Sequence, residues 1–107
     1  EIVGTVVQLG ARARRLNIGA RVGIPWLAWT DENCTYCRRG QENLCLYARF
    51  TGYDVDGGYA DYVAAQEAYC LPLPGTRADA ETAPLLCAGL IGYRTWRCRG
   101  HCQSGPG

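Results

Sequence analysis

The stretch DENCTYCRRGQENLC, residues 31–45, decides the fold of this chain. Two residues separate Asp31 from Cys34, and two more separate Cys34 from Cys37. Seven further residues lead to Cys45. Spacings this short let loop residues aim their side chains at one point, and zinc accepts sulfur and carboxylate oxygen in a tetrahedral set. The pattern therefore predicts a zinc ion held by these four residues with no open position, which is the character of a structural site.

The sequence around this pattern also indicates that the loop is cross-linked internally. Residues 26–50 are rich in Cys, Arg and Asn and show neither a helical nor a strand period. A loop of that length inside a small domain is unusual unless something holds it together. We expect Gly40 to supply the bend between the third and fourth ligands. We also expect Arg38 and Arg39 to offset part of the ligands' negative charge. The alternative is a loop with three incidental free thiols and no metal.

The rest of the chain is typical of short strands followed by a helix. A tight turn is predicted at Gly57-Gly58. Leu86, Leu90 and Tyr93 fall on one face at spacings of four and three, which predicts a helix from Leu86 onward. The predicted strands are Ile2–Leu9, Arg21–Ile24, Tyr59–Ala65 and Tyr69–Leu71, and a short helix is predicted from an N-cap at Asp79 through Ala83. This order predicts a mainly β fold with some α: a small β-barrel followed by a connecting helix.

Length and charge limit the classes of function. The chain has 107 residues, enough for one small domain, and its formal net charge is +1. That charge argues against a nucleic-acid partner held by a basic surface. No signal peptide opens the chain and no apolar run is long enough to span a bilayer, so we expect no membrane partner. The chain begins at Glu1 and contains no Met, so we expect the start of the gene product to precede it.

Seven cysteines are a high count for this length. A secreted, disulfide-bonded domain is one explanation. The number is odd, however, no secretory segment is visible, and three of the cysteines cluster at metal-ligand spacing. A reducing cytoplasm is therefore the preferred location, and the disulfide-bonded domain stays open as an alternative.

The last stretch, residues 97–107, differs in kind from what precedes it. It has no apolar period and combines Cys98, His101 and Cys102 with a Gly-Pro pair. We expect an aberrant or disordered tail, or a stretch read in the wrong frame, with the domain itself spanning residues 1–96. His101 is then a solvated tail residue and not a metal ligand.

Motifs outside the cysteine pattern make the sequence specific. They are EIVG at 1–4, GIPWL at 23–27, FTGY at 50–53 with DGGYA at 56–60, and APLLCAG at 83–89. Together with residues 34–45, and in this order, they resemble zinc-dependent (medium-chain) alcohol dehydrogenases. The resemblance covers residues 1 to about 96 and implies a fragment of the N-terminal GroES-like catalytic domain. That domain is a partly open β-barrel with a structural-zinc loop and a C-terminal connecting helix.

The resemblance implies roles for individual residues. Asp31 stands where the family usually has the first cysteine of its structural-zinc site. A carboxylate is a harder ligand than a thiolate, so we expect weaker zinc binding. Glu1 resembles the acidic residue beside the catalytic zinc, and Trp26 resembles a wall of the alcohol pocket, with a core aromatic as the alternative. The residues that resemble metal ligands are Cys34, Cys37 and Cys45 for the structural zinc and Cys87 for the catalytic zinc.

The resemblance also implies the chemistry of the intact protein. In the family, a catalytic zinc lowers the pKa of a primary or secondary alcohol, which passes a hydride to the nicotinamide of NAD or NADP. We expect the intact enzyme to act on a small alcohol or aldehyde and to form a homo-oligomer. No glycine fingerprint of a dinucleotide-binding domain is present, so we expect this fragment alone to be inactive. The alternative from another class is a free-standing zinc-binding interaction module without catalysis.

Overall fold

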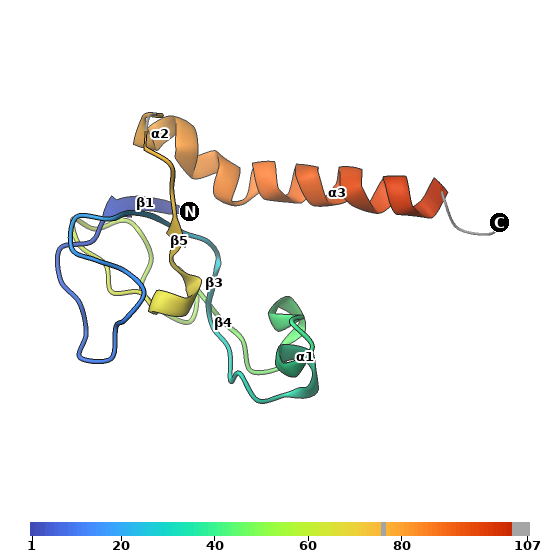
Figure 1. Cartoon of the computed structure of the whole chain (residues 1–107), viewed down its shortest axis with the longest axis horizontal. Coiled ribbons are helices and arrows are strands. Elements are labelled where there is room, and N and C mark those ends of the chain that lie inside the picture. The colour runs from blue at the N-terminus through green and yellow to red at the C-terminus, as the bar shows by residue number, and fades with distance from the viewer. Residues whose placement is uncertain (76, 104–107) are drawn as a thin grey trace.

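Two small antiparallel sheets and a series of short helices precede one long helix in the computed structural model (Figure 1). It describes residues 1–75 and 77–103, with side chains up to residue 99. The first sheet contains β1 (Ile2–Thr5), β2 (Arg21–Ile24) and β5 (Leu71–Pro72), and the second contains β3 (Leu27–Trp29) and β4 (Arg49–Phe50). The helices are α1 (Thr35–Arg38), α2 (Asp79–Thr82) and α3 (Ala88–Gln103), and the 3-10 helices are η1 (Glu42–Leu44), η2 (Glu67–Tyr69) and η3 (Ala83–Leu86). The expected fold class is confirmed, with the barrel represented by two open sheets.

The core lies against β2, the central strand of the first sheet. β1 and β5 both pair with β2 in the antiparallel sense, with Ile2 opposite Ile24 and Leu71 opposite Gly23. Apolar, β-branched residues suit such a half-buried surface. The buried cluster consists of Leu16, Val22, Ile24 and Cys70, and Ile2, Val6, Leu9 and Val63 pack against it. This core is small, as the length of the chain requires.

The second sheet carries the loop that contains the cysteine pattern. Trp29 of β3 lies opposite Arg49 of β4, and the Arg49 guanidinium carbon lies 5.8 Å from the centroid of the Trp29 ring. Trp26 stacks on Phe50 with ring centroids 4.7 Å apart. Residues 31–45 leave this ribbon and return to it, and they form a lobe beside the rest of the domain (Figure 1, green). We call residues 31–45 the cysteine lobe.

Some predicted elements are shorter than expected or of another kind. The strand predicted over Ile2–Leu9 ends at Thr5, where its ladder with β2 ends. The strand predicted over Tyr69–Leu71 begins only at Leu71, after η2. Residues 26–50, expected to lack regular structure, contain β3, α1, η1 and β4. These elements have two to four residues each, too few to show a period in the sequence.

Two predictions after the cysteine lobe are wrong. The turn lies at residues 52–54 and not at Gly57-Gly58. A Cβ atom at Gly58 would lie 2.7 Å from the Ile2 side chain, so this glycine allows close packing. The strand predicted over Tyr59–Ala65 does not form. Its aromatic residues favour a strand, but in the described ranges this segment pairs with neither sheet.

The N-cap predicted at Asp79 is also wrong. Ala78 occupies the N-cap position of α2, and Asp79 lies in the first turn. The Asp79 carboxylate instead forms an ion pair with Arg21 of β2 at 2.9 Å, so tertiary structure and not local capping decides its position.

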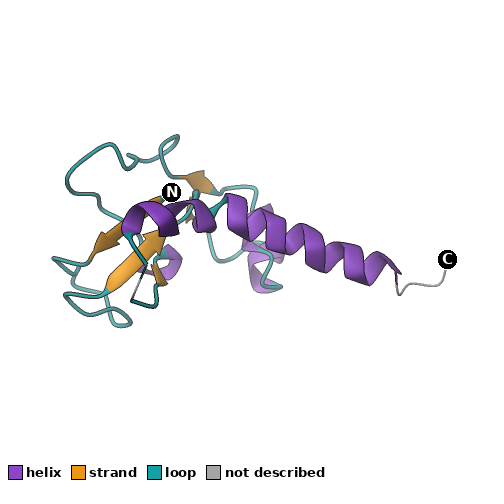
Figure 2. Ribbon diagram, turned by 90° about the horizontal axis from the view of Figure 1, so that it is seen from above, coloured by secondary structure: helices purple, strands orange, loops and turns teal. Residues whose placement is uncertain are grey.

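The long helix α3 extends past both sheets (Figures 1 and 2). It begins at Ala88 and continues to Gln103, so the chain is helical for part of the segment predicted to be a disordered tail. The side chains of His101 and Cys102, and all of residues 104–107, lie outside the described part of the chain. The radius of gyration of 15.7 Å exceeds the value of about 13 Å expected for a compact domain of this length.

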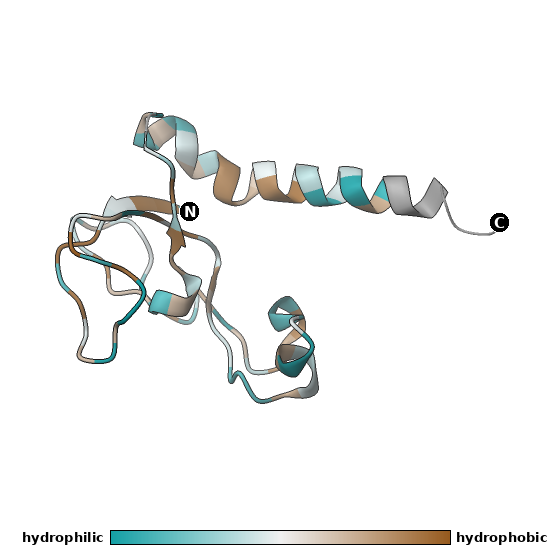
Figure 3. Ribbon diagram, in the orientation of Figure 1, coloured by the Kyte–Doolittle hydropathy of each residue, from teal (hydrophilic) through white to brown (hydrophobic). Residues whose placement is uncertain are grey.

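The surface of α3 is mixed in polarity. Its most apolar part is the beginning of the helix, and polar residues follow on several sides (Figure 3). Leu90, Ile91, Tyr93 and Trp96 are all exposed. No helix within the described ranges has both the length and the apolar character needed to cross a membrane.

Gly23 allows the segment before α3 to lie directly on β2. A Cβ atom at Gly23 would come within 2.6 Å of Cδ2 and 2.9 Å of Cδ1 of Leu86, which is buried in η3. A glycine inside a strand often marks such a close approach. The contact fixes η3, and with it the start of α3, against the sheet.

We predict that Gly23→Ala destabilises the chain by about 1–3 kcal/mol, the usual cost of overpacking a buried contact. The free energy of unfolding in urea measures the effect. Gly4→Ala in β1 is the matched control, because a Cβ atom there meets nothing within 4 Å. Equal stability of the two variants would contradict the close packing of Leu86 on β2.

A carboxylate clamp holds the loop that covers the core. The Glu67 carboxylate accepts the backbone N–H groups of Arg14, Arg15 and Leu16 at 3.2, 3.0 and 3.0 Å. The Arg15 guanidinium donates in turn to the carbonyl oxygens of Glu67 and Cys70. The N–H groups of Leu16 and Arg14 hold the pKa of Glu67 below its usual value of 4.5. The clamp thereby fixes Leu16 in the core.

We predict that Glu67→Gln lowers the midpoint of thermal unfolding at neutral pH. Folding lowers the pKa of Glu67, so the carboxylate contributes stability above its unfolded-state pKa near 4.5. That contribution is lost as the pH falls through the folded-state pKa. The difference between wild type and variant therefore shrinks in acid. Asp61→Asn, which changes an exposed carboxylate, is the control. If the difference in unfolding midpoint between wild type and Glu67→Gln stayed constant from neutral to acidic pH, the clamp would be disproved.

Candidate metal centre

The first turn of the cysteine lobe orients Asp31. β3 ends at Trp29, and Glu32 adopts a φ of +59°, a left-handed conformation that residues other than glycine seldom adopt. The backbone N–H groups of Asn33 and Cys34 donate to Oδ1 of Asp31 at 3.0 and 3.1 Å. The loop backbone therefore holds this carboxylate in place, at the cost of a strained residue, as is common at functional sites.

A short helix and a glycine place the three cysteines. Cys34 is the N-cap of α1, and its Sγ accepts the backbone N–H of Cys37 at 3.4 Å. The chain then reverses at Gly40, whose φ of +72° confirms the bend predicted between the third and fourth ligands. η1 returns the chain to Cys45, which is buried.

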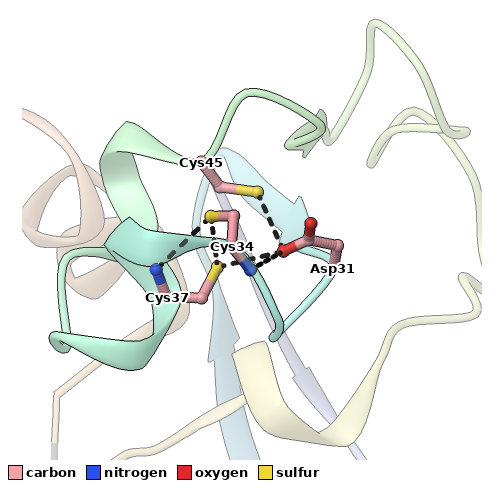
Figure 4. A group of neighbouring side chains, drawn as sticks. All are labelled: Asp31, Cys34, Cys37 and Cys45. Carbon is pink, nitrogen blue, oxygen red and sulfur yellow. Dashed lines mark hydrogen bonds between the residues drawn. The ribbon is translucent and has the colours of Figure 1, made fainter.

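The side chains of Asp31, Cys34, Cys37 and Cys45 converge on one point (Figure 4). One potential ligand atom from each lies within 4.8 Å of all the others. The Sγ atoms of Cys34 and Cys37 are 3.5 Å apart. Oδ1 of Asp31 lies 3.4 Å from Sγ of Cys37 and 3.5 Å from Sγ of Cys45.

These distances suit zinc. Tetrahedral zinc with Zn–S of about 2.3 Å and Zn–O of about 2.0 Å requires S···S separations of about 3.8 Å and S···O separations of about 3.5 Å. The S···S distance of 3.5 Å and the S···O distances of 3.4 and 3.5 Å lie within a few tenths of an ångström of these values. Three sulfurs and one carboxylate oxygen are also a donor set that zinc accepts. The cluster therefore fits a four-coordinate zinc ion.

The groups of the cluster differ in how readily they lose a proton. The N–H groups of Asn33 and Cys34 lower the pKa of Asp31 to about 2, so its carboxyl is ionised at neutral pH. The N–H of Cys37 lowers the pKa of the Cys34 thiol, whereas burial raises the pKa of Cys37 to about 12. Because zinc binds the thiolate, metal binding displaces a proton from Cys37.

The arginines beside the cluster face solvent. Arg38 and Arg39 are both exposed, and Arg38 donates to Oδ1 of Asn33 at 3.4 Å. Within the described residues, no ion pair joins either guanidinium to Asp31. Their attraction to the negative cluster therefore acts through solvent and is screened by salt.

The residues that the resemblance assigns to a catalytic zinc do not form a second cluster. Cys87 is half-buried at the C-cap of η3, Glu1 is exposed before β1, and Trp26 is 43% exposed. In the part of the chain that the structure describes, the cysteine lobe holds the one group of three or more potential metal ligands. The catalytic roles of these three residues stay predictions.

A half-open cavity of about 250 Å³ lies between the two sheets. Ile2 and Ile24 of the first sheet line it, as do Trp29 and Arg49 of the second. None of the residues predicted to serve a catalytic zinc or an alcohol lines it. This cavity therefore gives no support to the predicted substrate pocket.

Sequence reasoning missed two residues next to the metal centre. Thr30, directly before Asp31, is only 2% exposed, and its hydroxyl oxygen lies 2.5 Å from that of Tyr69. The one feature of the sequence that could have indicated a role for Thr30 is its position next to the predicted ligand Asp31. Its partner is 39 residues away, at a separation that no local pattern reveals.

Several curated proteins are similar to this chain in sequence. The family model of the alcohol dehydrogenase GroES-like domain matches residues 1–75. The chain is 49% identical over 100 residues to a probable alcohol dehydrogenase, AdhA, of Mycobacterium tuberculosis. It is 41% identical over 100 residues to an alcohol dehydrogenase of Geobacillus stearothermophilus. The alignments cover 89% and 94% of this chain but 29% and 30% of the two relatives.

Solved structures share the fold. A cinnamyl alcohol dehydrogenase of Sorghum bicolor matches with a TM-score of 0.82 and 25% identity, over 98% of this chain and 32% of that one. A CAD of Helicobacter pylori, complexed with NADP(H), matches with a TM-score of 0.81 and 27% identity, over 91% of this chain and 30% of that one.

The chain thus spans about three-tenths of the length of these relatives. Three of these relatives are named as alcohol dehydrogenases, so the alternative of a free-standing interaction module gains no support from them. Because the family model matches well over half of the residues, the chain belongs to the alcohol dehydrogenase GroES-like domain family.

Proposed function

We propose that this chain is the zinc-binding part of a zinc-dependent alcohol dehydrogenase and that its cysteine lobe holds a structural zinc ion. The ligands are Asp31, Cys34, Cys37 and Cys45. Their convergence within 4.8 Å is the observation that carries the proposal. Four protein ligands leave no position for a substrate, and the free energy of zinc binding adds to the stability of the lobe.

The intact protein is proposed to transfer a hydride between a primary or secondary alcohol and NAD or NADP. The similarity to a probable alcohol dehydrogenase, and to an enzyme solved with NADP(H), supports this reaction. The protein's part in such chemistry is to position the cofactor against the substrate. Since the chain spans only about three-tenths of these relatives, the reaction belongs to the intact protein.

Cys87, Glu1 and Trp26 are proposed to serve the catalytic zinc and the alcohol pocket. β1 and β2 are antiparallel, so Glu1, before β1, and Trp26, after β2, leave the ladder at the same end. Cys87 follows Leu86, which packs on β2. We assign Cys87 as a ligand, Glu1 as the acid beside the metal, and Trp26 as a wall of the pocket. When bound, the zinc lowers the pKa of the alcohol.

We further propose that the domain spans residues 1–96, with 97–107 as an aberrant tail, and that the intact protein is a cytoplasmic homo-oligomer without membrane or nucleic-acid partners. The cysteines whose side chains are described are all free, which suits a reducing compartment. The net charge of +1 offers little to a nucleic acid.

We predict about one zinc per chain, with an affinity that follows the residue at position 31. Asp31→Cys raises the affinity because a thiolate is the softer ligand. Asp31→Ala lowers the affinity by at least roughly tenfold. Loss of a residue that only hydrogen-bonds to a metal ligand already weakens binding by about that factor, and a ligand itself should matter at least as much. Competition with a chromophoric chelator measures the affinity.

Two matched variants control this experiment. Asp61→Ala removes an exposed carboxylate outside the lobe and leaves the affinity unchanged. Cys98→Ser removes an exposed thiol outside the lobe with the same expected result. An unchanged affinity in Asp31→Ala would show that the carboxylate only accepts the N–H groups of Asn33 and Cys34 and does not bind zinc.

We predict that this fragment neither oxidises alcohols nor binds a nicotinamide cofactor. Hydride transfer needs a cofactor held against the substrate carbon, and that positioning supplies a large share of the rate. Calorimetric titration with NAD and NADP, beside an ethanol oxidation assay with added zinc, tests this. Turnover above a metal-free blank that Cys87→Ser abolishes would overturn the prediction.

A further inference from the structure

Cys34 and Cys37 are placed for a bond to each other as well as for a metal. They stand three residues apart, at the N-cap and inside α1, and side chains at that spacing lie on one face of a helical turn. Their Sγ atoms are 3.5 Å apart, and a disulfide needs a separation of about 2.0 Å. The remaining approach of about 1.5 Å is within the reach of side-chain rotation.

Cys45, the third thiol of the cysteine lobe, is placed differently. It is buried, whereas Cys34 and Cys37 are half-buried and open to a small molecule from solution. Its Sγ lies 3.5 Å from Oδ1 of Asp31, and a carboxylate cannot form a disulfide. Three thiols can form only one disulfide at a time. Access therefore favours the pair Cys34 and Cys37 and leaves Cys45 as a free thiol.

We propose that Cys34 and Cys37 are a reversible redox modification site, and that a disulfide formed between them by a small-molecule disulfide expels the metal from the cysteine lobe. The release of metal rests on the proposed zinc site, whereas the disulfide itself rests on the two thiols alone. In a reducing compartment a disulfide of this kind is transient and is typical of redox sensing.

The exchange takes two steps and consumes one molecule of a small disulfide such as oxidised glutathione. The thiolate of one cysteine attacks a sulfur of the small disulfide, forms a mixed disulfide and releases one small thiolate. The thiolate of the other cysteine attacks the protein sulfur of that mixed disulfide and releases the second small thiolate. The two cysteines together lose two electrons and two protons, which the small disulfide takes up as it becomes two thiols.

Metal binding and disulfide formation compete for the same two sulfurs. Zinc binds the thiolate, and a sulfur in a disulfide is no longer one. Oxidation leaves Asp31 and Cys45 as the two remaining ligands, where a structural zinc needs four. The disulfide closes only residues 34–37, so residues 38–45 lose the link that the metal provides between Cys45 and the rest of the lobe.

Equilibration of the zinc-loaded full chain at increasing ratios of oxidised to reduced glutathione tests the proposal. An indicator dye measures released zinc, and alkylation in denaturant followed by trypsin and mass spectrometry locates the remaining thiols. Cleavage after Arg21, Arg38, Arg39 and Arg49 places Cys34 and Cys37 in one peptide, 22–38, and Cys45 in another, 40–49. We expect an internal disulfide in peptide 22–38, an alkylated Cys45, and about one zinc released per disulfide. Return to reduced glutathione and zinc reverses all three.

Variants measured without metal identify the pair. Cys45→Ser forms the disulfide in peptide 22–38 at the same glutathione ratio as the wild type, because Cys45 takes no part. In Cys34→Ser and Cys37→Ser the small thiol stays attached as a mixed disulfide, because the thiol that would displace it is gone. Cys98→Ser, which removes an exposed thiol outside the lobe, behaves as the wild type.

The outcomes separate this inference from the zinc site itself. A reduced wild-type chain that binds no zinc would overturn the proposed metal centre, and with it the release of metal on oxidation. A reduced chain that binds zinc, but keeps both its metal and the thiols of Cys34 and Cys37 at the most oxidising ratio, would overturn the redox site alone. A disulfide that joins Cys45 to either cysteine would do the same. The wild type alone gives these results, so the test does not depend on the folding of a variant.

Discussion

The pairing of β3 with β4 is the constraint on which the metal centre depends. It holds Trp29 and Arg49 opposite one another and so closes the chain between them into a loop. Loop closure costs conformational entropy before any ligand meets another. The ladder, the stacking of Trp26 on Phe50 and the contact of the Arg49 guanidinium with the Trp29 ring offset part of that cost. With both ends fixed, the local turns need only orient the four ligands.

The features that were predictable from the sequence are local ones. The ligand pattern lies within residues 31–45, so its spacing alone indicates that the four side chains can meet. Gly40 could be assigned to a bend because a reversal is needed before Cys45 and glycine alone adopts a positive φ without strain. The strand Arg21–Ile24 was predictable because β-branched residues end at a proline, and it lies at the centre of its sheet.

The features that could not be predicted depend on contacts distant in the chain. Thr30 meets Tyr69 across 39 residues, and Glu67 meets the backbone of Leu16 across 51. Asp79 is a residue type that favours the N-cap position, but it pairs with Arg21, 58 residues away in the chain. Tyr59–Ala65 has the composition of a strand but pairs with neither sheet in the described ranges. Local preference yields to tertiary structure at each of these positions.

A carboxylate in place of a fourth thiol changes how the metal centre exchanges protons with solvent. The N–H groups of Asn33 and Cys34 lower the pKa of Asp31 to about 2, so its carboxyl carries no proton to be displaced at neutral pH. In the proposed zinc site, metal uptake therefore releases protons from the thiols alone, whereas a site of four cysteines also has a fourth thiol proton to lose. By mass action, the affinity of this lobe for zinc declines less steeply on acidification than that of an all-cysteine lobe. With a carboxylate as its fourth ligand, the proposed site has a lower affinity for zinc at neutral pH than a site of four cysteines, and acid empties it more gradually.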